Sequence, residues 1–154
     1  MMNKETIVEA DVNDAEEITS LTKISKAFWG YDDKQIKKWE KDLTMTKDYI
    51  IENKVYKITC GNDLKGYYSY IEKEDKVVEL DNIFLHPDSI GKGYGSVLMN
   101  DFLKKMKKSH FEKIQLYAEP KAEKFYIKFG FKTVSRIKSD IPNRFLPVME
   151  LNIK

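Results

Sequence analysis

The feature of this sequence that most constrains its fold is a glycine-rich loop set between a strand-like and a helix-like segment. Residues 85–96 read Leu-His-Pro-Asp-Ser-Ile-Gly-Lys-Gly-Tyr-Gly-Ser, in which three glycines alternate over five positions. The β-rich segment 77–85 precedes the loop, and apolar residues four apart over 94–108 indicate that a helix follows it at once. Glycines let a backbone approach closely, and the first amides of a helix point at negative charge. The loop therefore predicts a cradle for a phosphate or pyrophosphate.

The glycine spacing excludes two other phosphate-binding loops. A P-loop requires Gly-x-x-x-x-Gly-Lys-Ser/Thr, which residues 85–96 do not contain. A dinucleotide fingerprint requires Gly-x-Gly-x-x-Gly on the first strand–helix turn, whereas here the third glycine, Gly95, comes one residue early and the loop follows three β-rich segments. Taken alone, the loop is also compatible with a flexible glycine-rich turn.

The patterns around the loop predict a single α/β domain over residues 1–154. Apolar residues at helical spacing indicate a first helix from Asp14, the expected N-cap, to Phe28, and a second over about 33–43. Trp29-Gly30-Tyr31 breaks the helical pattern between them. Further helices are expected over 94–108 and 122–129, with strands over 5–10, 55–60, 66–72, 77–85, 114–118, 131–137 and 145–153.

Connectivity predicts how some of these strands pair. The three segments 55–60, 66–72 and 77–85 are separated by short turns and are expected to form an antiparallel meander. A helix connects 77–85 to 114–118, so these two strands are expected to be parallel neighbours.

The composition argues against several classes of function. Lys plus Arg number 27 and Asp plus Glu 25, so the net charge of +2 gives no electrostatic case for binding nucleic acid. One cysteine and two histidines form neither a disulfide nor a metal-ligand spacing. No apolar stretch approaches the roughly 20 residues that a membrane span needs. We therefore expect a cytoplasmic protein without a metal, a nucleic-acid partner or a membrane partner.

Several motifs together resemble the GNAT superfamily of acetyl-CoA-dependent N-acetyltransferases. The family signature Arg/Gln-x-x-Gly-x-Gly/Ala maps onto residues 90–95. Residues 122–131, Ala-Glu-Lys-Phe-Tyr-Ile-Lys-Phe-Gly-Phe, resemble its Ala-x-x-Phe-Tyr-x-x-x-Gly-Phe motif, and residues 144–149 resemble its Arg-x-Leu-Pro-x-Met ending. The resemblance is dense over 77–154 and rests on element order before that. It implies a mixed, mostly antiparallel sheet of six or seven strands flanked by about four helices.

The resemblance also implies a co-substrate and a reaction. Acetyl-CoA would donate its acetyl group directly to a primary amine, without an acyl-enzyme. Its pantetheine arm would lie between strands 77–85 and 114–118, with a backbone amide near Phe84 or Leu85 binding the developing oxyanion. The loop residues expected to hold the cofactor are Ile90, Gly91, Lys92, Gly93, Tyr94, Gly95 and Ser96. Ile90 stands where the family usually has Arg or Gln, and Lys92 could supply the missing charge.

The catalytic candidates come from two places. The resemblance puts the hydroxyl of Tyr126 near the CoA sulfur, where a phenol can donate to the departing thiolate; the alternative role for Tyr126 is core packing. Glu79 and Asp81 lie two apart on a strand and so share one face. Either carboxylate could be the general base, although a water chain or a simply solvated strand face would also fit.

The break between the first two helices is the expected acceptor side. Trp29 and Tyr31 could line an amine pocket, whereas Trp39 is expected to serve in helix packing. The acceptor itself stays open. Two alternatives also stay open: a transferase for a longer acyl group, and a CoA-binding regulatory or interaction module without turnover. The resemblance further allows a homodimer in which part of the last strand pairs across subunits.

Overall fold

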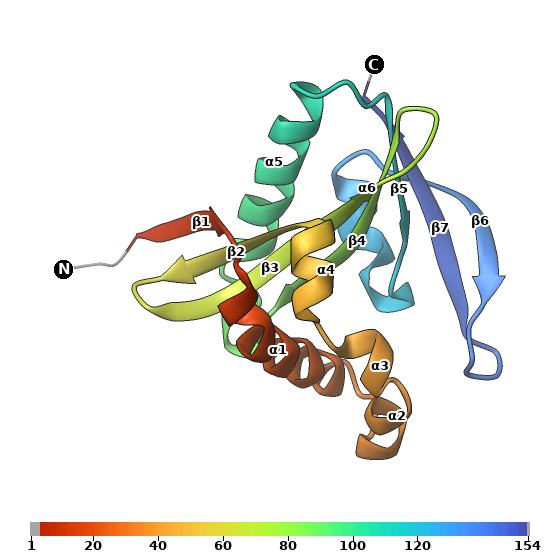
Figure 1. The fold of residues 1–154 in the computed structure, drawn as a ribbon. Helices are drawn as coiled ribbons and strands as arrows, with labels where there is room; N and C mark the ends of the chain where they lie inside the picture. The colour runs from red at the N-terminus through yellow and green to blue at the C-terminus, as the bar shows by residue number, and fades with distance from the viewer. Residues whose placement is uncertain (1–3, 154) are drawn as a thin grey trace. The chain divides into compact units, whose positions relative to one another are not determined.

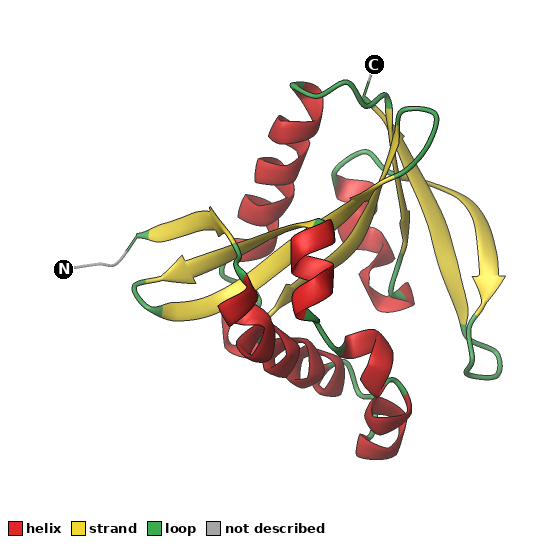
Figure 2. Ribbon diagram, viewed as in Figure 1, coloured by secondary structure: helices red, strands yellow, loops and turns green. Residues whose placement is uncertain are grey.

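The computed structural model describes residues 4–153, which form a seven-stranded sheet with six α-helices (Figures 1 and 2). The elements in chain order are β1 (Glu5–Glu9), η1 (Val12–Asp14), α1 (Ala15–Phe28), α2 (Asp33–Lys38), α3 (Glu40–Leu43), α4 (Lys47–Glu52), β2 (Lys54–Cys60), β3 (Asp63–Glu72), β4 (Val77–Leu85), η2 (Pro87–Ser89), α5 (Tyr94–Lys107), β5 (Lys113–Tyr117), η3 (Pro120–Ala122), α6 (Glu123–Lys128), β6 (Lys132–Lys138) and β7 (Phe145–Asn152). The expected mixed α/β class is confirmed.

The strand order is β1-β2-β3-β4-β5-β7-β6. Strand β2 pairs antiparallel with β1 and with β3, and β7 pairs antiparallel with β5 and with β6. The predicted parallel pair is confirmed, because Val78 of β4 lies opposite Ile114 of β5 in a parallel register. The helical crossover through α5 is what makes this pair parallel.

The chain divides into two compact units, each described here by itself. The first unit runs from β1 to Tyr70 and includes Asn82–Leu103. The second unit consists of Ile71–Asp81 together with the segment that begins at Lys104.

Strand β3 organises the first unit because both of its faces are buried. Alternate residues of a strand point to opposite faces. Tyr67 faces a core built mainly by α1 and α4, and Tyr68 packs edge-on against Phe102 of α5 on the other face. Tyr67 and Tyr68 are 1% and 0% exposed. The core on the Tyr67 face comprises Ala10, Ala15, Ile18, Leu21, Met45, Ile50, Val55 and Tyr67.

The second unit is built around β5 and β7. Ile114 and Leu116 of β5 and Met149 of β7 are buried, as is Phe131 at the start of the last hairpin. The helix α6 that precedes this hairpin ends close to Gly130, as the sequence predicted. Burying each such large apolar side chain contributes roughly 1.5–3 kcal/mol.

Two details of the predicted helices are wrong. Asp14 precedes α1, but its carboxylate accepts from the Asp11 amide at 2.9 Å and pairs with Lys57 at 2.8 Å instead of capping the helix. The turn η1 comes before α1, and Asp11 caps that turn in a reciprocal arrangement with Asp14. The single helix expected over 33–43 is two helices, because Trp39 leaves helical geometry with ψ near 8°.

No helix within residues 4–153 is long and apolar enough to cross a membrane. In the same part of the chain, no group of three or more His, Cys, Asp or Glu side chains is arranged to hold a metal ion.

Gly66 is the position in β3 where a side chain cannot fit. A Cβ there would lie 2.6 Å from the carbonyl oxygen of Phe84 and 2.7 Å from Cδ2 of Leu85. We expect Gly66→Ala to lower the free energy of unfolding by about 1–3 kcal/mol, because overpacking forces backbone shifts. Urea denaturation measures the change, with Lys65→Ala, one residue earlier in the strand, as the control. Equal stability of Gly66→Ala and the parent would contradict the close approach.

Candidate functional site

The glycine loop joins β4 to α5 in the first unit. After Leu85 the chain makes the short turn η2, which His86 caps by accepting from the Asp88 amide at 3.2 Å. Gly91 and Gly93 then adopt positive φ angles of 82° and 87°. The Val97 amide donates to the Gly93 carbonyl at 3.1 Å, so the helical pattern begins at the loop. As at any helix N-terminus, the amides that precede Val97 lie too early in the chain for an i−4 bond within the helix, which is the geometry that binds anions.

The two glycines serve conformation and not packing. A Cβ built at Gly91 or at Gly93 would have nothing within 4 Å. A residue with a Cβ loses conformational free energy in the left-handed region of φ and ψ. The positive φ angles are therefore the reason for glycine at both positions, and a lack of space is not. The loop is exposed from Ile90 to Gly93, and Lys92 adds a positive charge. An exposed loop of this shape, opening a helix, suits an anionic group.

The other first-unit candidates lie at the end of β4 and after α1. Phe84 is half-buried and stacks on Tyr67, with ring centroids 5.8 Å apart. Trp29 is the residue after α1, and its ring packs edge-on against Phe28 at 6.5 Å. Tyr31 packs edge-on against Trp39 at 5.0 Å. The structure therefore brings Tyr31 together with Trp39, a residue that sequence reasoning assigned to helix packing.

Tyr126 lies in α6 of the second unit and is 8% exposed. Its ring packs edge-on against Phe125 and Phe131. Burial raises the pKa of the Tyr126 phenol well above its ordinary value, and the negative charge of Glu119 raises it further. The phenol is therefore protonated at neutral pH and can donate a proton or a hydrogen bond.

Glu119 belongs to an ion pair that sequence reasoning missed. Its carboxylate accepts from Arg144 at 2.7 Å, and their side chains are only 11% and 14% exposed. Arg144 opens the stretch 144–149 that resembles the family's ending, but 25 positions separate it from Glu119, so only folding reveals the pair. The pair ties η3 to the residue before β7.

Glu79 and Asp81 share a face of β4, as their spacing predicted. Burial is the main cause that raises the pKa of Glu79, and the nearby Asp81 raises it further. The Lys73 ammonium lies 3.5 Å from the Glu79 carboxylate, and its positive charge opposes this rise by lowering the pKa of Glu79. The Glu79 side chain is 15% exposed, whereas Asp81 is exposed. Of the two carboxylates, Glu79 therefore has the environment that suits a general base.

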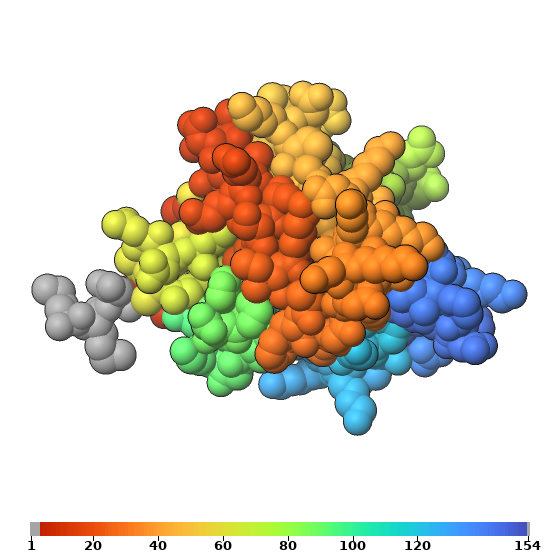
Figure 3. All heavy atoms as spheres, turned by 90° about the horizontal axis from the view of Figure 1, so that it is seen from below, coloured from red at the N-terminus to blue at the C-terminus, as the bar shows by residue number. Residues whose placement is uncertain are grey.

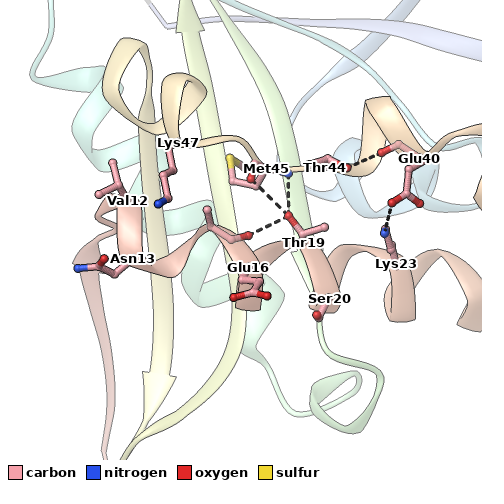
Figure 4. Close-up of a pocket in the computed structure, with 11 residues that line it drawn as sticks. Val12, Asn13, Glu16, Thr19, Ser20, Lys23, Glu40, Thr44, Met45 and Lys47 are labelled. Atoms are coloured by element: carbon pink, nitrogen blue, oxygen red, sulfur yellow. Dashed lines mark hydrogen bonds and ion pairs between the residues drawn. The ribbon is translucent and has the colours of Figure 1, made fainter.

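A separate hollow lies on the first unit beside α1, α3 and the start of α4 (Figure 4). Its volume is about 560 Å³. The Thr19 hydroxyl donates to the Ala15 carbonyl at 2.8 Å and accepts from the Met45 amide at 2.9 Å, and Lys23 pairs with Glu40 at 2.6 Å. These contacts join the helices, and the glycine loop takes no part in the hollow.

Comparison with known proteins decides the family. The family model described as the acetyltransferase (GNAT) domain matches residues 29–151, a span that includes the glycine loop, Glu79 and Tyr126. The chain belongs to the GNAT acetyltransferase family.

Solved GNAT structures share the fold. The PaiA N-acetyltransferase from Thermoplasma acidophilum, solved in complex with coenzyme A, superposes with a TM-score of 0.79 at 20% identity, over 97% of this chain and 99% of that one. The ribosomal-protein-S18-alanine N-acetyltransferase from Escherichia coli superposes with a TM-score of 0.74 at 16% identity, over 97% and 94%.

Curated relatives are matched over shorter stretches. The uncharacterized N-acetyltransferase ycf52 of Porphyra purpurea is 38% identical over 50 residues, which are 32% of this chain and 29% of the relative. The ycf52 protein of Pyropia yezoensis is 25% identical over 89 residues, 58% of this chain and 51% of the relative. The matches thus cover at most about half of these relatives.

The environment of Glu79 predicts its titration. We expect the Glu79 carboxyl to titrate with a midpoint above its ordinary pKa of 4.5. The midpoint should be lower in Asp81→Asn and higher in Lys73→Met. Carbon-13 NMR of labelled glutamate measures the midpoint, with Glu79→Gln identifying the signal.

The raised pKa of Glu79 also makes stability depend on pH. A raised folded-state pKa means that the stability contributed by protonated Glu79 is lost as pH rises through that pKa. The stability of Glu79→Gln relative to the parent should therefore improve from acidic to neutral pH. A midpoint at or below 4.5 would contradict burial as the dominant cause.

Proposed function

We propose that this GNAT protein is a cytoplasmic N-acetyltransferase, with residues 1–154 as a single domain, that transfers the acetyl group of acetyl-CoA to a primary amine by direct attack. The observation that carries the proposal is the loop at the end of β4, where Gly91 and Gly93 hold left-handed conformations ahead of helix α5. The open space beside these two glycines and the first amides of α5, which lie too early for an i−4 bond within the helix, fit the pyrophosphate of CoA. The N-acetyltransferase names of the relatives support the same reaction class.

The loop residues would hold the donor mainly through their backbone. Amides over residues 91–96 would donate to the pyrophosphate oxygens, and Lys92 would add the charge that Ile90 lacks in place of Arg or Gln. Acetyl-CoA supplies an activated thioester. A backbone amide at Phe84 or Leu85 would donate to the thioester oxygen as negative charge develops there.

Proton transfer would be divided between two residues. An alkylamine has a pKa of about 10.4, so the attacking nitrogen must lose a proton to become nucleophilic. Glu79 would accept that proton, directly or through water, because its raised pKa makes it a stronger base than an exposed carboxylate. As the nitrogen–carbon bond forms and the carbon–sulfur bond breaks, Tyr126 would donate its proton to the departing thiolate.

We expect Tyr126→Phe to bind acetyl-CoA like the parent but to lower kcat at least about tenfold, the low side of what an acid–base group contributes. The substitution keeps the ring packed on Phe125 and Phe131. Isothermal titration measures binding, and free-thiol release across a panel of primary amines measures turnover.

The matched control for this experiment is Tyr56→Phe, which removes a hydroxyl from a half-buried tyrosine of β2 whose ring stacks on Tyr68. It should leave kcat unchanged. An unchanged kcat in Tyr126→Phe would rule out the assigned proton donor. Binding of acetyl-CoA without turnover on any amine would favour a CoA-binding module without catalysis. Faster turnover with longer acyl-CoA thioesters than with acetyl-CoA would identify the protein as a transferase for a longer acyl group. No binding of acetyl-CoA would refute the whole proposal.

The loop itself is tested by Gly93→Ala. Alanine in the left-handed region costs roughly 1–2 kcal/mol, so the loop should relax away from the binding shape. We expect the Kd for acetyl-CoA to rise at least about fivefold, measured by isothermal titration. Gly61→Ala is the control, since Gly61 also has a positive φ, of 65°, but lies in the turn between β2 and β3. Equal weakening in both variants would assign the effect to lost stability and not to the loop.

A further inference from the structure

Three aromatic rings of the first unit surround one ammonium group. The Nζ of Lys26 lies 5.5 Å from the ring centroid of Tyr31, 5.5 Å from that of Trp39 and 5.8 Å from that of Phe84. We call Tyr31, Trp39 and Phe84 the aromatic box. Figure 3 shows the face on which α1, α2 and α3, coloured red to orange, reach the surface.

The box is assembled from segments that are separate in sequence. Lys26 comes from the last turn of α1, Tyr31 from the break after it, Trp39 from the junction of α2 and α3, and Phe84 from β4. The loss of helical geometry at Trp39 falls at the residue whose ring packs edge-on against Tyr31. Both interruptions of the helical region thus lie at or beside a residue of the box.

Three rings at this distance make a site for a positive charge. The face of an aromatic ring is negative, and a cation within about 6 Å of its centroid is attracted to it. The attraction favours the charged form of an amine over the neutral form. An ammonium held in the box is therefore poorly suited to be the nucleophile, which must be neutral.

The box also borders the predicted reaction centre. Phe84 contributes its ring to the box, and its backbone is the expected position of the oxyanion donor. An acceptor whose charged end occupied the box would thus be anchored at the residue beside the thioester oxygen. A second amine on the same molecule, separated by a short alkyl chain, could stay neutral and attack.

We propose that the aromatic box is the acceptor's cation site, that the acceptor carries an alkylammonium group in addition to the amine that is acetylated, and that Lys26 occupies the box until the acceptor displaces it. The acceptor class rests on the proposed acetyl transfer, whereas cation binding by the box does not. Lys26 then determines specificity, because only a ligand cation that outcompetes it gains the site. The assignment gives Trp39 a role in recognition beside Tyr31.

Cation binding can be measured without turnover. The chain has two tryptophans, so Trp29→Phe leaves Trp39 as the single reporter. In this background, tetramethylammonium chloride should change Trp39 fluorescence saturably, with sodium chloride at equal ionic strength as the blank. Lys26→Ala should lower the Kd for tetramethylammonium about threefold or more, because the ammonium that competes for the box has been removed. Tyr31→Leu should abolish the response.

Lys23→Ala is the matched control, since Lys23 lies one turn earlier on α1 and pairs with Glu40. It should leave the Kd for tetramethylammonium unchanged. The proposal is overturned by an absence of saturable binding in both the parent background and Lys26→Ala, by equal affinities with and without Lys26, or by the same gain in Lys23→Ala. Circular dichroism confirms that each variant is folded.

Turnover separates the acceptor class from the proposed reaction. With acetyl-CoA, 1,4-diaminobutane should show a kcat/KM at least about tenfold above that of 1-aminobutane, and Lys26→Ala should raise it further for the diamine only. Equal kcat/KM for the two amines would overturn the acceptor class while leaving acetyl transfer in place. Tetramethylammonium binding without turnover on either amine would keep the cation site and refute acetyl transfer to these amines.

Discussion

The burial of strand β3 on both faces is the constraint on which the first unit depends. Tyr67 directs its ring toward the core of α1 and α4, and Tyr68 directs its ring toward Phe102 of α5. One strand therefore holds two helical layers at a fixed distance. Gly66 in the same strand leaves room for the Phe84 carbonyl and Leu85, so the end of β4 can lie against it.

This arrangement positions the residues of the first unit that belong to the proposed site. Because Phe84 stacks on Tyr67, the end of β4 is held where its ring can form a wall of the aromatic box. Because α5 packs through Phe102, the glycine loop that opens it is supported by a packed helix. Gly91 and Gly93 adopt positive φ angles in this exposed loop, a conformation that glycine takes up without strain.

Desolvation determines the proton affinities of the two second-unit residues for which catalytic roles are proposed. Burial raises the pKa of both Tyr126 and Glu79, but the consequences differ. It keeps the phenol protonated and able to donate, and it makes the carboxylate a better proton acceptor. The proposed acid, Tyr126, and the proposed base, Glu79, would both depend on this one physical effect, and Lys73 limits the rise in the pKa of Glu79.

The pattern of residues along the chain determined much of the secondary structure of this protein. The strand–glycine–helix sequence of residues 77–96 and the helix end at Gly130 were predictable because each depends on residues close in the chain. The parallel pair β4 and β5 was predictable because a helix connects the two strands. Tertiary structure alone decided the rest. Asp14 forms an ion pair with Lys57, and Glu119 forms one with Arg144. The Lys26 ammonium lies over the rings of both Trp39 and Phe84. In each case the partner comes from a distant segment of the chain, so only the folded structure determines which side chains meet. Periodicity records which residues are apolar, but the neighbours of a side chain depend on packing across the fold.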